Sequence, residues 1–296
     1  MSENGYEYVR SGGSGFYVQQ RGLISVWGKE AVQFLDGLIS NNVKALPDGE
    51  QMLAAFPNAQ GRLLAVVRVL RQGERFLFET EAATREKVFQ NLFRFTFAGD
   101  FFVEDISDGY RFLDVINYGS SAPSSAFRYT AGGFETIAVP VDEWPGFQKT
   151  LEASGGVEID DELYETLRIE SGIRKYGVDM DETTIVPELG IDGLISYNKG
   201  CYIGQEIIAR IHFRGHVAKQ LIGLVLTGNE GNDIGSDSTL ELLTKDGKNA
   251  GRVTSITFSP RLSEKIALAY VRFEYLGAGT NLMYGEGQAT VTCLPF

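Results

Sequence analysis

Short apolar runs separated by glycine, asparagine and aspartate fill the last part of the chain, from Val217 onward. Runs of this length, broken by turn-forming residues at regular intervals, are typical of β-strands rather than helices. Strands spaced in this way form a small barrel or sandwich. We therefore predict a C-terminal β-barrel domain over residues 217–296, with strands at 217–226, 239–243, 251–258, 266–273 and 288–294.

The residues before this tail mix strand-like and helix-like patterns. Two apolar runs, 63–70 and 75–80, flank the tripeptide Gln72-Gly73-Glu74 and predict a β-hairpin. The polar, glycine-rich stretch 1–15 predicts a loosely ordered lead-in. Spacing and turn residues predict helices at 29–38, 84–97, 144–154 and 160–171, and further short strands at 23–27, at 52–56 and between 101 and 141.

Charge and cysteine content limit the classes of function. The net charge of -12 argues against broad, sequence-independent nucleic-acid binding, which needs a basic surface. The two cysteines, Cys201 and Cys293, are too few for a disulfide framework in a chain of this size. The sequence has no apolar run of about 18 residues and no signal-peptide pattern at its start. We therefore expect a cytoplasmic protein without a membrane partner.

The helix predicted at 160–171 places a carboxylate at the end of an apolar stripe. Leu163, Leu167 and Glu170 stand at i, i+4 and i+7, and so lie on one face of the helix. Because an unpaired buried charge is costly, Glu170 needs hydrogen-bond donors or a counter-ion. One interpretation is that Glu170 receives N–H groups from a bound heterocycle. The other, which spacing alone favours, is that it pairs with a basic residue at the helix end, Arg168, Arg174 or Lys175.

The next stretch, 176–182, is acidic. It carries three carboxylates within four residues, Asp179, Asp181 and Glu182. These residues lack the spacing and the glycine of a calcium-binding loop. We therefore predict a solvated acidic loop at this place in the chain.

The octapeptide Lys199-Gly200-Cys201-Tyr202-Ile203-Gly204-Gln205-Glu206 combines a cysteine with two flanking glycines. Glycines permit close backbone approach and unusual dihedral angles. Both Lys199 and the N-terminus of a short helix predicted at 205–210 would favour a thiolate at Cys201. On the residues alone, the alternative that Cys201 is a small buried apolar side chain stays open.

Residues 210–216, directly after the octapeptide, alternate polar and apolar side chains. As a strand, this stretch places Arg210, His212, Arg214 and His216 on one side. A basic strip in an acidic protein suits an anionic ligand such as a polyglutamate tail, a phosphate or an RNA backbone. The alternatives are a strand face paired with carboxylates, or a metal site of Cys201, His212 and His216, whose spacing matches no standard zinc motif.

Three segments together resemble a known family. The octapeptide 199–206 is the signature of the YgfZ-type folate-binding proteins, which are relatives of the aminomethyltransferase (T-protein) of the glycine cleavage system. Residues 24–26 and 34–43 resemble the family's opening strand, helix and tN-x-V element. Residues 167–182 resemble the shared block L-R-x-E-x-G, Y-G and D-E. The resemblance is specific at the octapeptide and extends weakly over nearly the whole chain.

The resemblance implies an α+β fold with three β-rich subdomains around a central folate-binding opening, the last a small β-barrel. Residues 1–216 would form an aminomethyltransferase-like folate-binding region of two interleaved subdomains. In the aminomethyltransferases the Glu of the L-R-x-E block holds the pterin ring, and that position is Glu170 here. We predict that tetrahydrofolate, or a one-carbon derivative of it, contacts Glu170, Arg168, Tyr176, Lys199, Tyr202, Gln205 and Arg210.

One departure narrows the activity that the resemblance implies. Aminomethyltransferases carry a catalytic aspartate shortly after a glycine pair, and the corresponding stretch 60–66 has no carboxylate. YgfZ-type proteins share that loss and are linked to maintenance of iron–sulfur enzymes, including those that thiolate tRNA. We therefore expect a folate-binding protein that assists iron–sulfur cluster assembly or repair and thereby tRNA modification, with Cys201 and Lys199 as catalytic residues and iron–sulfur proteins as partners.

Two alternatives from other classes stay open. A folate-dependent aminomethyltransferase or demethylase needs a carboxylate near the reacting folate nitrogen, which the sequence does not show. A non-enzymatic RNA-binding module would bind tRNA directly through the basic strip 210–216. The sequence also leaves open whether the protein turns over a substrate at all.

Overall fold

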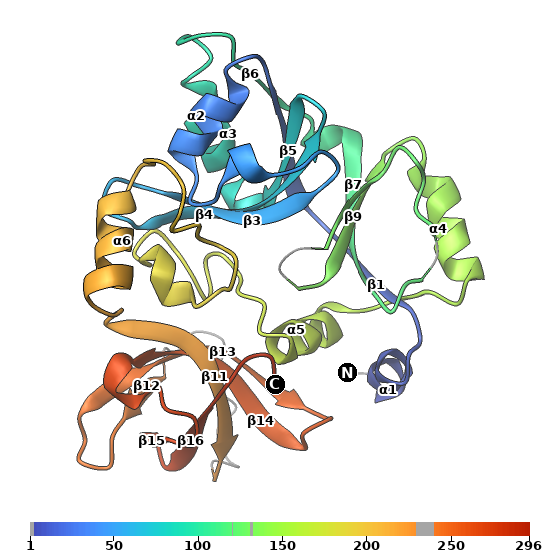
Figure 1. Ribbon diagram of the computed structural model, residues 1–296. Helices are drawn as coiled ribbons and strands as arrows, with labels where there is room; N and C mark the ends of the chain where they lie inside the picture. The colour runs from blue at the N-terminus through green and yellow to red at the C-terminus, as the bar shows by residue number, and fades with distance from the viewer. Residues whose placement is uncertain (1–2, 120, 131–132, 229–239) are drawn as a thin grey trace. The chain divides into compact units, whose positions relative to one another are not determined.

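The computed structural model of the chain describes residues 3–119, 121–130, 133–228 and 240–296 (Figure 1). The chain divides into two compact units, and each unit is built from two separate stretches. Unit 1 consists of Met1–Tyr164 and Gly193–Gln205, and unit 2 consists of Glu165–Asp192 and Glu206–Phe296. Among the described helices, none is long and apolar enough to cross a membrane. The domain boundary at residue 216 stays a prediction.

The first sheet of unit 1 is antiparallel, and its order is β3-β4-β5-β2-β6. The strands are β2 (Arg21–Trp27), β3 (Gln51–Pro57), β4 (Leu63–Gln72), β5 (Arg75–Glu81) and β6 (Phe102–Asp105). The predicted hairpin is present as β4 and β5. Apolar side chains of helices α2 (Ala31–Leu38) and α3 (Arg85–Phe93), among them Leu35 and Leu92, share one buried core with Val67 and Phe78 of the sheet. Short 3-10 turns η1 (Val43–Ala45) and η2 (Ala82–Thr84) join these elements.

The second sheet of unit 1 has the order β10-β1-β7-β9-β8. Its strands are β1 (Gly15–Gln19), β7 (Tyr110–Ile116), β8 (Phe127–Tyr129), β9 (Glu135–Pro140) and the two-residue β10 (Val157–Glu158), and the 3-10 turn η3 (Ser107–Gly109) precedes β7. The predicted helix at 144–154 is present as α4 (Trp144–Ala153). Phe147 and Leu151 of this helix join Phe16, Leu113 and Ile137 in a second buried core.

A buried polar network links the two sheets of unit 1. The Nε of Arg68 on β4 donates to Glu79 on β5 at 2.6 Å, and its Nη2 donates to Thr136 on β9 at 2.7 Å. Thr136 in turn donates to Asp114 on β7. Burial, together with the nearby charge of Arg21, lowers the pKa of Arg68 to about 9. A buried charge needs such partners, so this network fixes how the sheets of unit 1 pack.

Unit 2 contains the predicted barrel. Six strands close in the order β11-β14-β13-β12-β15-β16 around an apolar interior that includes Leu224, Val253 and Leu282. The strands are β11 (Lys219–Thr227), β12 (Glu241–Leu243), β13 (Asn249–Ser259), β14 (Glu264–Arg272), β15 (Asn281–Tyr284) and β16 (Gly287–Thr292), with the 3-10 turn η5 (Phe273–Tyr275) after β14. Residue 239, the predicted start of the second strand, lies outside the described residues. The predicted α+β class with a final barrel is confirmed.

Three further elements connect or flank these bodies. They are α5 (Asp161–Glu170), the 3-10 turn η4 (Val186–Leu189) and α6 (Gln205–Arg214). The side chain of Asp160 accepts a hydrogen bond from the backbone N–H of Leu163 and so caps α5, while Gly172 adopts a φ of 67° just after its end. The predicted helix at 160–171 is therefore present, with its stop at the predicted glycine.

Two sequence-based expectations about unit 1 are wrong. The stretch predicted as a loose lead-in forms helix α1 (Glu3–Arg10), because Tyr6 and Val9 bury one side of it. Helix α3 ends at Phe93 rather than at residue 97. From Phe95 on, the backbone hydrogen bonds are of the i to i−3 type, and Phe97 is 85% exposed. Burial of Phe97 therefore does not stabilise a further α-helical turn there.

Candidate functional site

The segment 193–204, which contains most of the octapeptide, is fixed along one stretch of unit 1. That stretch, residues 36–42, spans the end of α2 and the residues after it. The hydroxyl of Ser40 donates to the carbonyl oxygen of Leu194 at 2.6 Å, and the amide of Asn41 donates to that of Gly193 at 2.7 Å. The backbone N–H of Ile203 donates to the carbonyl oxygen of Gly37 at 3.0 Å. The cysteine-bearing segment therefore belongs structurally to the helix α2 region.

Lys199 holds the middle of this segment. Its ammonium donates to the carbonyl oxygens of Asp36, Ile39 and Asn41 at 2.7, 2.8 and 2.7 Å, which accounts for its three protons. The Asp36 carboxylate lies 3.3 Å away. Burial lowers the pKa of Lys199, while the charge of Asp36 acts in the opposite direction. In this conformation Lys199 closes the end of α2, because C-terminal carbonyls of a helix favour a cation.

Gly204 brings the end of the octapeptide against the β3–β4 turn. A Cβ atom built on Gly204 would lie 2.3 Å from the carbonyl oxygen of Asn58, and the residue has a φ of 81°. Only glycine tolerates both conditions at once. The turn itself is shaped by the Asn58 side chain, which accepts hydrogen bonds from the backbone N–H groups of Gln60 and Arg62. No carboxylate occurs in residues 57–66 around this turn, and the octapeptide packs directly on it.

The remaining octapeptide residues differ in exposure. Cys201 is a free, exposed cysteine, so it is not the buried apolar side chain of the alternative interpretation. Tyr202 is buried, its ring centroid lies 5.1 Å from the Lys199 Nζ, and burial raises its pKa to about 12. Gln205 begins α6 and donates its backbone N–H to the carbonyl oxygen of Tyr202. The structure therefore brings Lys199, Cys201, Tyr202 and Gln205 together in unit 1.

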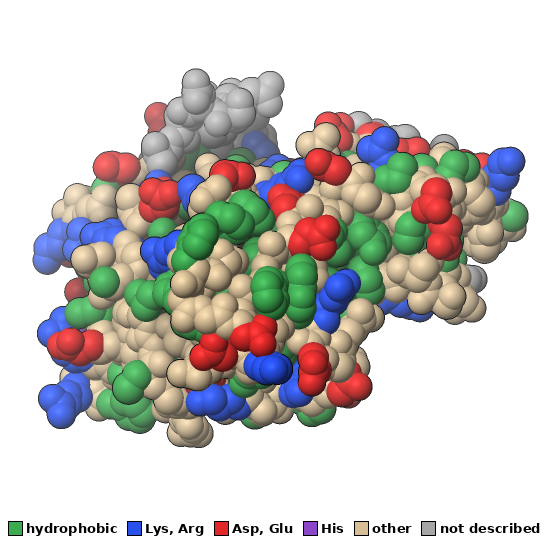
Figure 2. All heavy atoms as spheres, turned by 90° about the horizontal axis from the view of Figure 1, so that it is seen from above, with side chains coloured by type: hydrophobic (Ala, Val, Ile, Leu, Met, Phe, Trp, Pro, Cys, Tyr) green, Lys and Arg blue, Asp and Glu red, His purple; other side chains and the backbone are tan. Residues whose placement is uncertain are grey.

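The predicted basic strand after the octapeptide is wrong, because residues up to Arg214 continue helix α6. Ile208 is fully buried, and this apolar anchor suits a helix. Residues two apart on a helix point about 200° away from each other, so Arg210 and His212 do not share a side. The ring of His216, beyond the helix, stacks on Phe273 at 3.7 Å. On the face shown in Figure 2, basic side chains are interspersed with acidic ones.

Glu170, at the end of α5 in unit 2, is 1% exposed. Its Oε1 accepts a hydrogen bond from the hydroxyl of Ser259 on β13 at 2.5 Å. The carboxylate is therefore buried and accepts a hydrogen bond from a neutral hydroxyl group. Arg174, one of the counter-ions considered from the sequence, directs its guanidinium to backbone carbonyl oxygens of Gly172 and Leu189.

Arg168 fastens α5 to the barrel within unit 2. All five of its N–H donors are used, in two bonds to Glu165, one to Asp179, one to Ser255 and one to the carbonyl oxygen of Ile173. Burial alone would lower the pKa of Arg168, but Glu165 and Asp179 raise it above its usual value. Arg168 therefore positions the helix that carries Glu170.

The predicted solvated acidic loop is only partly solvated. Asp179 is fully buried, because it pairs with Arg168 at 2.7 Å and accepts hydrogen bonds from Thr254 and Ser255 of the barrel. Tyr176 is half-buried in the same loop. Arg210 is exposed on α6. Among the described residues, no group of three His, Cys, Asp or Glu side chains could hold a metal ion.

Several residues of these two groups were not expected from the sequence. Asp36, Asn58 and Ser259 form contacts between segments far apart in the chain, and the local patterns around Asn58 and Ser259 do not indicate these contacts. Asp36 has a partial signal, because it is a carboxylate in a mostly apolar helix, where a buried charge needs partners as it does at Glu170.

Two family models match the chain. The GCVT N-terminal domain matches residues 2–122, and the glycine cleavage T-protein C-terminal barrel domain matches residues 219–296. An aminomethyltransferase of Rubrobacter xylanophilus is 30% identical over 98% of this chain and 85% of its own. The mitochondrial iron-sulfur cluster assembly factor IBA57 homolog of Mycosarcoma maydis is 28% identical over 70% of this chain and 56% of its own.

A solved structure shows the same fold. The crystal structure of the glycine cleavage system aminomethyltransferase T from Bartonella henselae has a TM-score of 0.82 at 20% identity, over 96% of this chain and 86% of that one. Three sheets with a final closed barrel thus define an aminomethyltransferase-like protein. The chain belongs to the glycine cleavage T-protein family, as a YgfZ-type protein related to the aminomethyltransferases. The resemblance noted in the sequence is confirmed.

Proposed function

We propose that the protein binds tetrahydrofolate and assists the assembly or repair of iron–sulfur proteins, and thereby tRNA modification. The observation that carries this proposal is the position of the octapeptide. An exposed Cys201 stands in a segment whose Gly204 packs on the β3–β4 turn, where Asn58 and its neighbours supply no carboxylate. The similarity to an iron-sulfur cluster assembly factor supports the same assignment.

The chemistry of Glu170 fits a pterin ring. A buried carboxylate accepts hydrogen bonds from ring and amino N–H groups, and a site built for such donors discriminates strongly against ligands that lack them. Arg168, with its donors used inside unit 2, would act by positioning Glu170 rather than by touching the ligand. We propose that Tyr176, Arg210, Tyr202 and Gln205 also contact folate. Lys199, whose three protons are used by carbonyl oxygens of the α2 region, would act by positioning the octapeptide.

Calorimetric titration with tetrahydrofolate tests the folate part. Glu170→Ala should weaken binding by about tenfold or more, because the pterin N–H groups lose their charged acceptor. Glu162→Ala, which removes an exposed carboxylate from the same helix, should leave the affinity within about twofold. Equal affinity of the native protein and the Glu170 variant would remove Glu170 from the site.

Complementation of a cell that lacks the protein tests the role of Cys201. Cys201→Ser should abolish restored activity of iron–sulfur enzymes, because a hydroxyl is a far weaker nucleophile and metal ligand than a thiolate. Cys293→Ser is the matched control, since it removes the other exposed cysteine. Full activity of the Cys201 variant would disprove the mechanistic part of the proposal while leaving folate binding intact.

The relatives give a second candidate function, a folate-dependent aminomethyltransferase or demethylase. An aminomethyltransferase matches the chain over nearly its full length. Mixing the protein with the other glycine-cleavage components and measuring methylenetetrahydrofolate decides between the two. Formation of that product at a rate above the uncatalysed background would favour this second function.

A further inference from the structure

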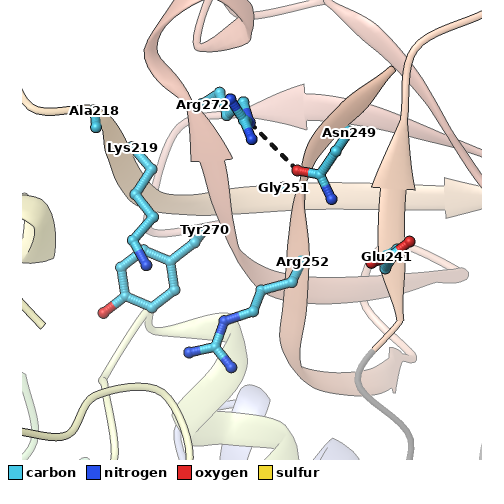
Figure 3. Close-up of a pocket in the computed structure, with 8 residues that line it drawn as sticks. All are labelled: Ala218, Lys219, Glu241, Asn249, Gly251, Arg252, Tyr270 and Arg272. Atoms are coloured by element: carbon cyan, nitrogen blue, oxygen red, sulfur yellow. Dashed lines mark hydrogen bonds between the residues drawn. The ribbon is translucent and has the colours of Figure 1, made fainter. Parts of the chain in front are cut away.

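A cavity of about 600 Å³ opens on the barrel wall of unit 2 (Figure 3). Val271 points into the barrel interior, so its strand neighbours Tyr270 and Arg272 point outward into this cavity. The volume is that of a site for a small molecule. The residues that line it come from the adjacent strands β11, β14, β13 and β12 and from the residue before β11. They are Ala218, Lys219, Glu241, Asn249, Gly251, Arg252, Tyr270 and Arg272.

Two cations in this cavity converge on one aromatic ring. The Nζ of Lys219 on β11 lies 4.6 Å from the ring centroid of Tyr270, and the Cζ of Arg252 on β13 lies 5.6 Å from the same centroid. Figure 3 shows both side chains directed toward that ring from opposite neighbouring strands. The Tyr270 side chain is itself buried, and its ring forms a rigid wall beside both charges.

Neither Lys219 nor Arg252 forms a hydrogen bond or a close ion pair with any residue in the part of the chain that the structure describes. Arg272, the third cation, differs from them, because its Nε donates to the side chain of Asn249 at 3.3 Å. Lys219 and Arg252 therefore both line this cavity beside the Tyr270 ring without a close carboxylate partner, although the chain as a whole carries a net charge of -12.

Lys219 and Arg252 also act electrostatically on the carboxylate of Asp181 in unit 2. Burial alone would raise the pKa of Asp181, but hydrogen bonds from Thr183, helped by Arg252 and Lys219, bring it below its usual value. The Oδ1 of Asp181 is taken by the backbone N–H and the hydroxyl of Thr183. Asp181 does not line the cavity, so it attracts Lys219 and Arg252 only from a distance.

We propose that this cavity is a binding site for a small organic anion, separate from the folate site. Its phosphate or carboxylate group would bridge Lys219 and Arg252, since two like charges held together favour a shared counter-ion. Glu241 on β12, the cross-strand neighbour of Arg252 on β13, would accept hydrogen bonds from hydroxyl or amino groups of the same molecule (Figure 3).

Titration calorimetry with two probes, pyrophosphate and citrate, tests the site and identifies the anionic group. Binding of pyrophosphate alone assigns a phosphate ligand, and binding of citrate alone assigns a carboxylate ligand. Lys219→Gln and Arg252→Gln should each weaken binding of the preferred probe by about tenfold. Arg252→Lys, which keeps the charge, should retain most of the affinity. The four proteins are compared by circular dichroism melting, so that a folding defect is recognised.

Lys245→Gln is the matched control, because it removes the same charge from an exposed position between β12 and β13 that does not line the cavity. Its affinity for the probe should equal that of the native protein. Binding of neither probe at concentrations up to about 10 mM, or equal weakening by Lys245→Gln and Arg252→Gln, would overturn the proposal. Tetrahydrofolate binding is measured on the same variants and should not change, which separates this site from the proposed folate site.

Discussion

Gly204 is the residue on which the position of the reactive segment depends most sharply. Its backbone has a left-handed φ of 81°, and its Cα faces the carbonyl oxygen of Asn58 with no space for a methyl group. A side chain here must therefore both strain the backbone and displace a turn. The left-handed backbone and the contact with Asn58 each cost free energy of folding. A second glycine with positive φ but no close contact allows the two costs to be measured separately.

Gly204→Ala should lower the free energy of unfolding by about 2–4 kcal/mol, from left-handed strain together with the clash against Asn58. Gly193→Ala isolates the first effect, because Gly193 has a φ of 75° with nothing near its Cβ position. It should cost only about 1 kcal/mol. Urea unfolding of both variants measures the difference. Similar losses in the two would mean that the Asn58 contact yields at little cost.

At the scale of elements, the segment 193–204 is attached to α2 mainly through one buried ammonium. Lys199→Met should reduce stability by about 2–4 kcal/mol, because three charge-assisted hydrogen bonds to carbonyl oxygens are lost in a buried place. Hydrogen exchange at the N–H groups of Ser196 and Ile203, which bond to residues of the α2 region, should accelerate in parallel.

Lys44→Met is the control for that experiment. Lys44 also reaches Asp36, at 3.1 Å, but its side chain is 62% exposed. Exposed ion pairs contribute little, so this variant should change stability by less than about 1 kcal/mol. If it destabilises the protein as much as Lys199→Met does, then the charge on Asp36, and not closure of the helix end, accounts for the effect.

Helix α5 depends on the buried pair of Arg168 and Asp179. Asp179→Asn should cost about 3 kcal/mol in thermal or urea unfolding, because it leaves the Arg168 charge without its buried partner. Glu165→Gln removes the other partner of Arg168, which is 35% exposed, and should cost no more than about 1 kcal/mol. A reversed order of the two losses would contradict the assignment of Asp179 as the principal partner.

Local patterns predicted the elements better than their interactions. The hairpin of β4 and β5, the helices α4 and α5 and the barrel strands follow from apolar spacing and turn residues, which act over a few positions. Residues 210–214 show why the approach fails elsewhere. Alternation of polar and apolar side chains fits a strand, yet Ile208 is buried as part of a helix that begins at Gln205. Packing of Ile208 against the rest of the protein favours the helix over the strand.

The candidate site was predictable only in part for a related reason. The octapeptide and Glu170 are recognisable from the sequence, because the motif is specific and a carboxylate on an apolar stripe is unusual. The partners of these residues are not. Lys199 and Asp36 are separated by 163 positions, and Glu170 and Ser259 by 89. No periodicity in the chain relates such distant residues, so their contacts follow from the three-dimensional fold alone.

At the scale of the whole molecule, neither unit is a continuous piece of chain. Unit 2 needs residues 165–192 as well as the barrel, since Asp179 bonds to Thr254 and Ser255, and Ile169 shares a buried core with Leu221 and Leu268. A cut between the predicted domains at residue 216 divides this unit. The two resulting pieces are therefore not expected to be equivalent to two folded domains.

A fragment of residues 217–296 should accordingly be poorly soluble or bind a hydrophobic dye, because cutting away residues 165–192 uncovers the apolar surface around Leu221 and Leu268. A fragment of residues 165–296 retains the missing contacts and should give a cooperative thermal transition. Circular dichroism melting and dye fluorescence of both fragments measure this. A stable, dye-negative 217–296 fragment would show that the barrel is autonomous.

The return of residues 193–205 to unit 1 has a consequence for the order of synthesis. The ribosome synthesises the strands of both unit 1 sheets before it makes Lys199. The carbonyl oxygens at the end of α2 therefore have no Lys199 partner until the chain is 163 residues longer than at Asp36. Residues 165–192 of unit 2 are also synthesised before Lys199. The segment that carries Cys201 bonds to residues of the α2 region, so a chain that has not yet reached Lys199 cannot hold that thiol in its final position.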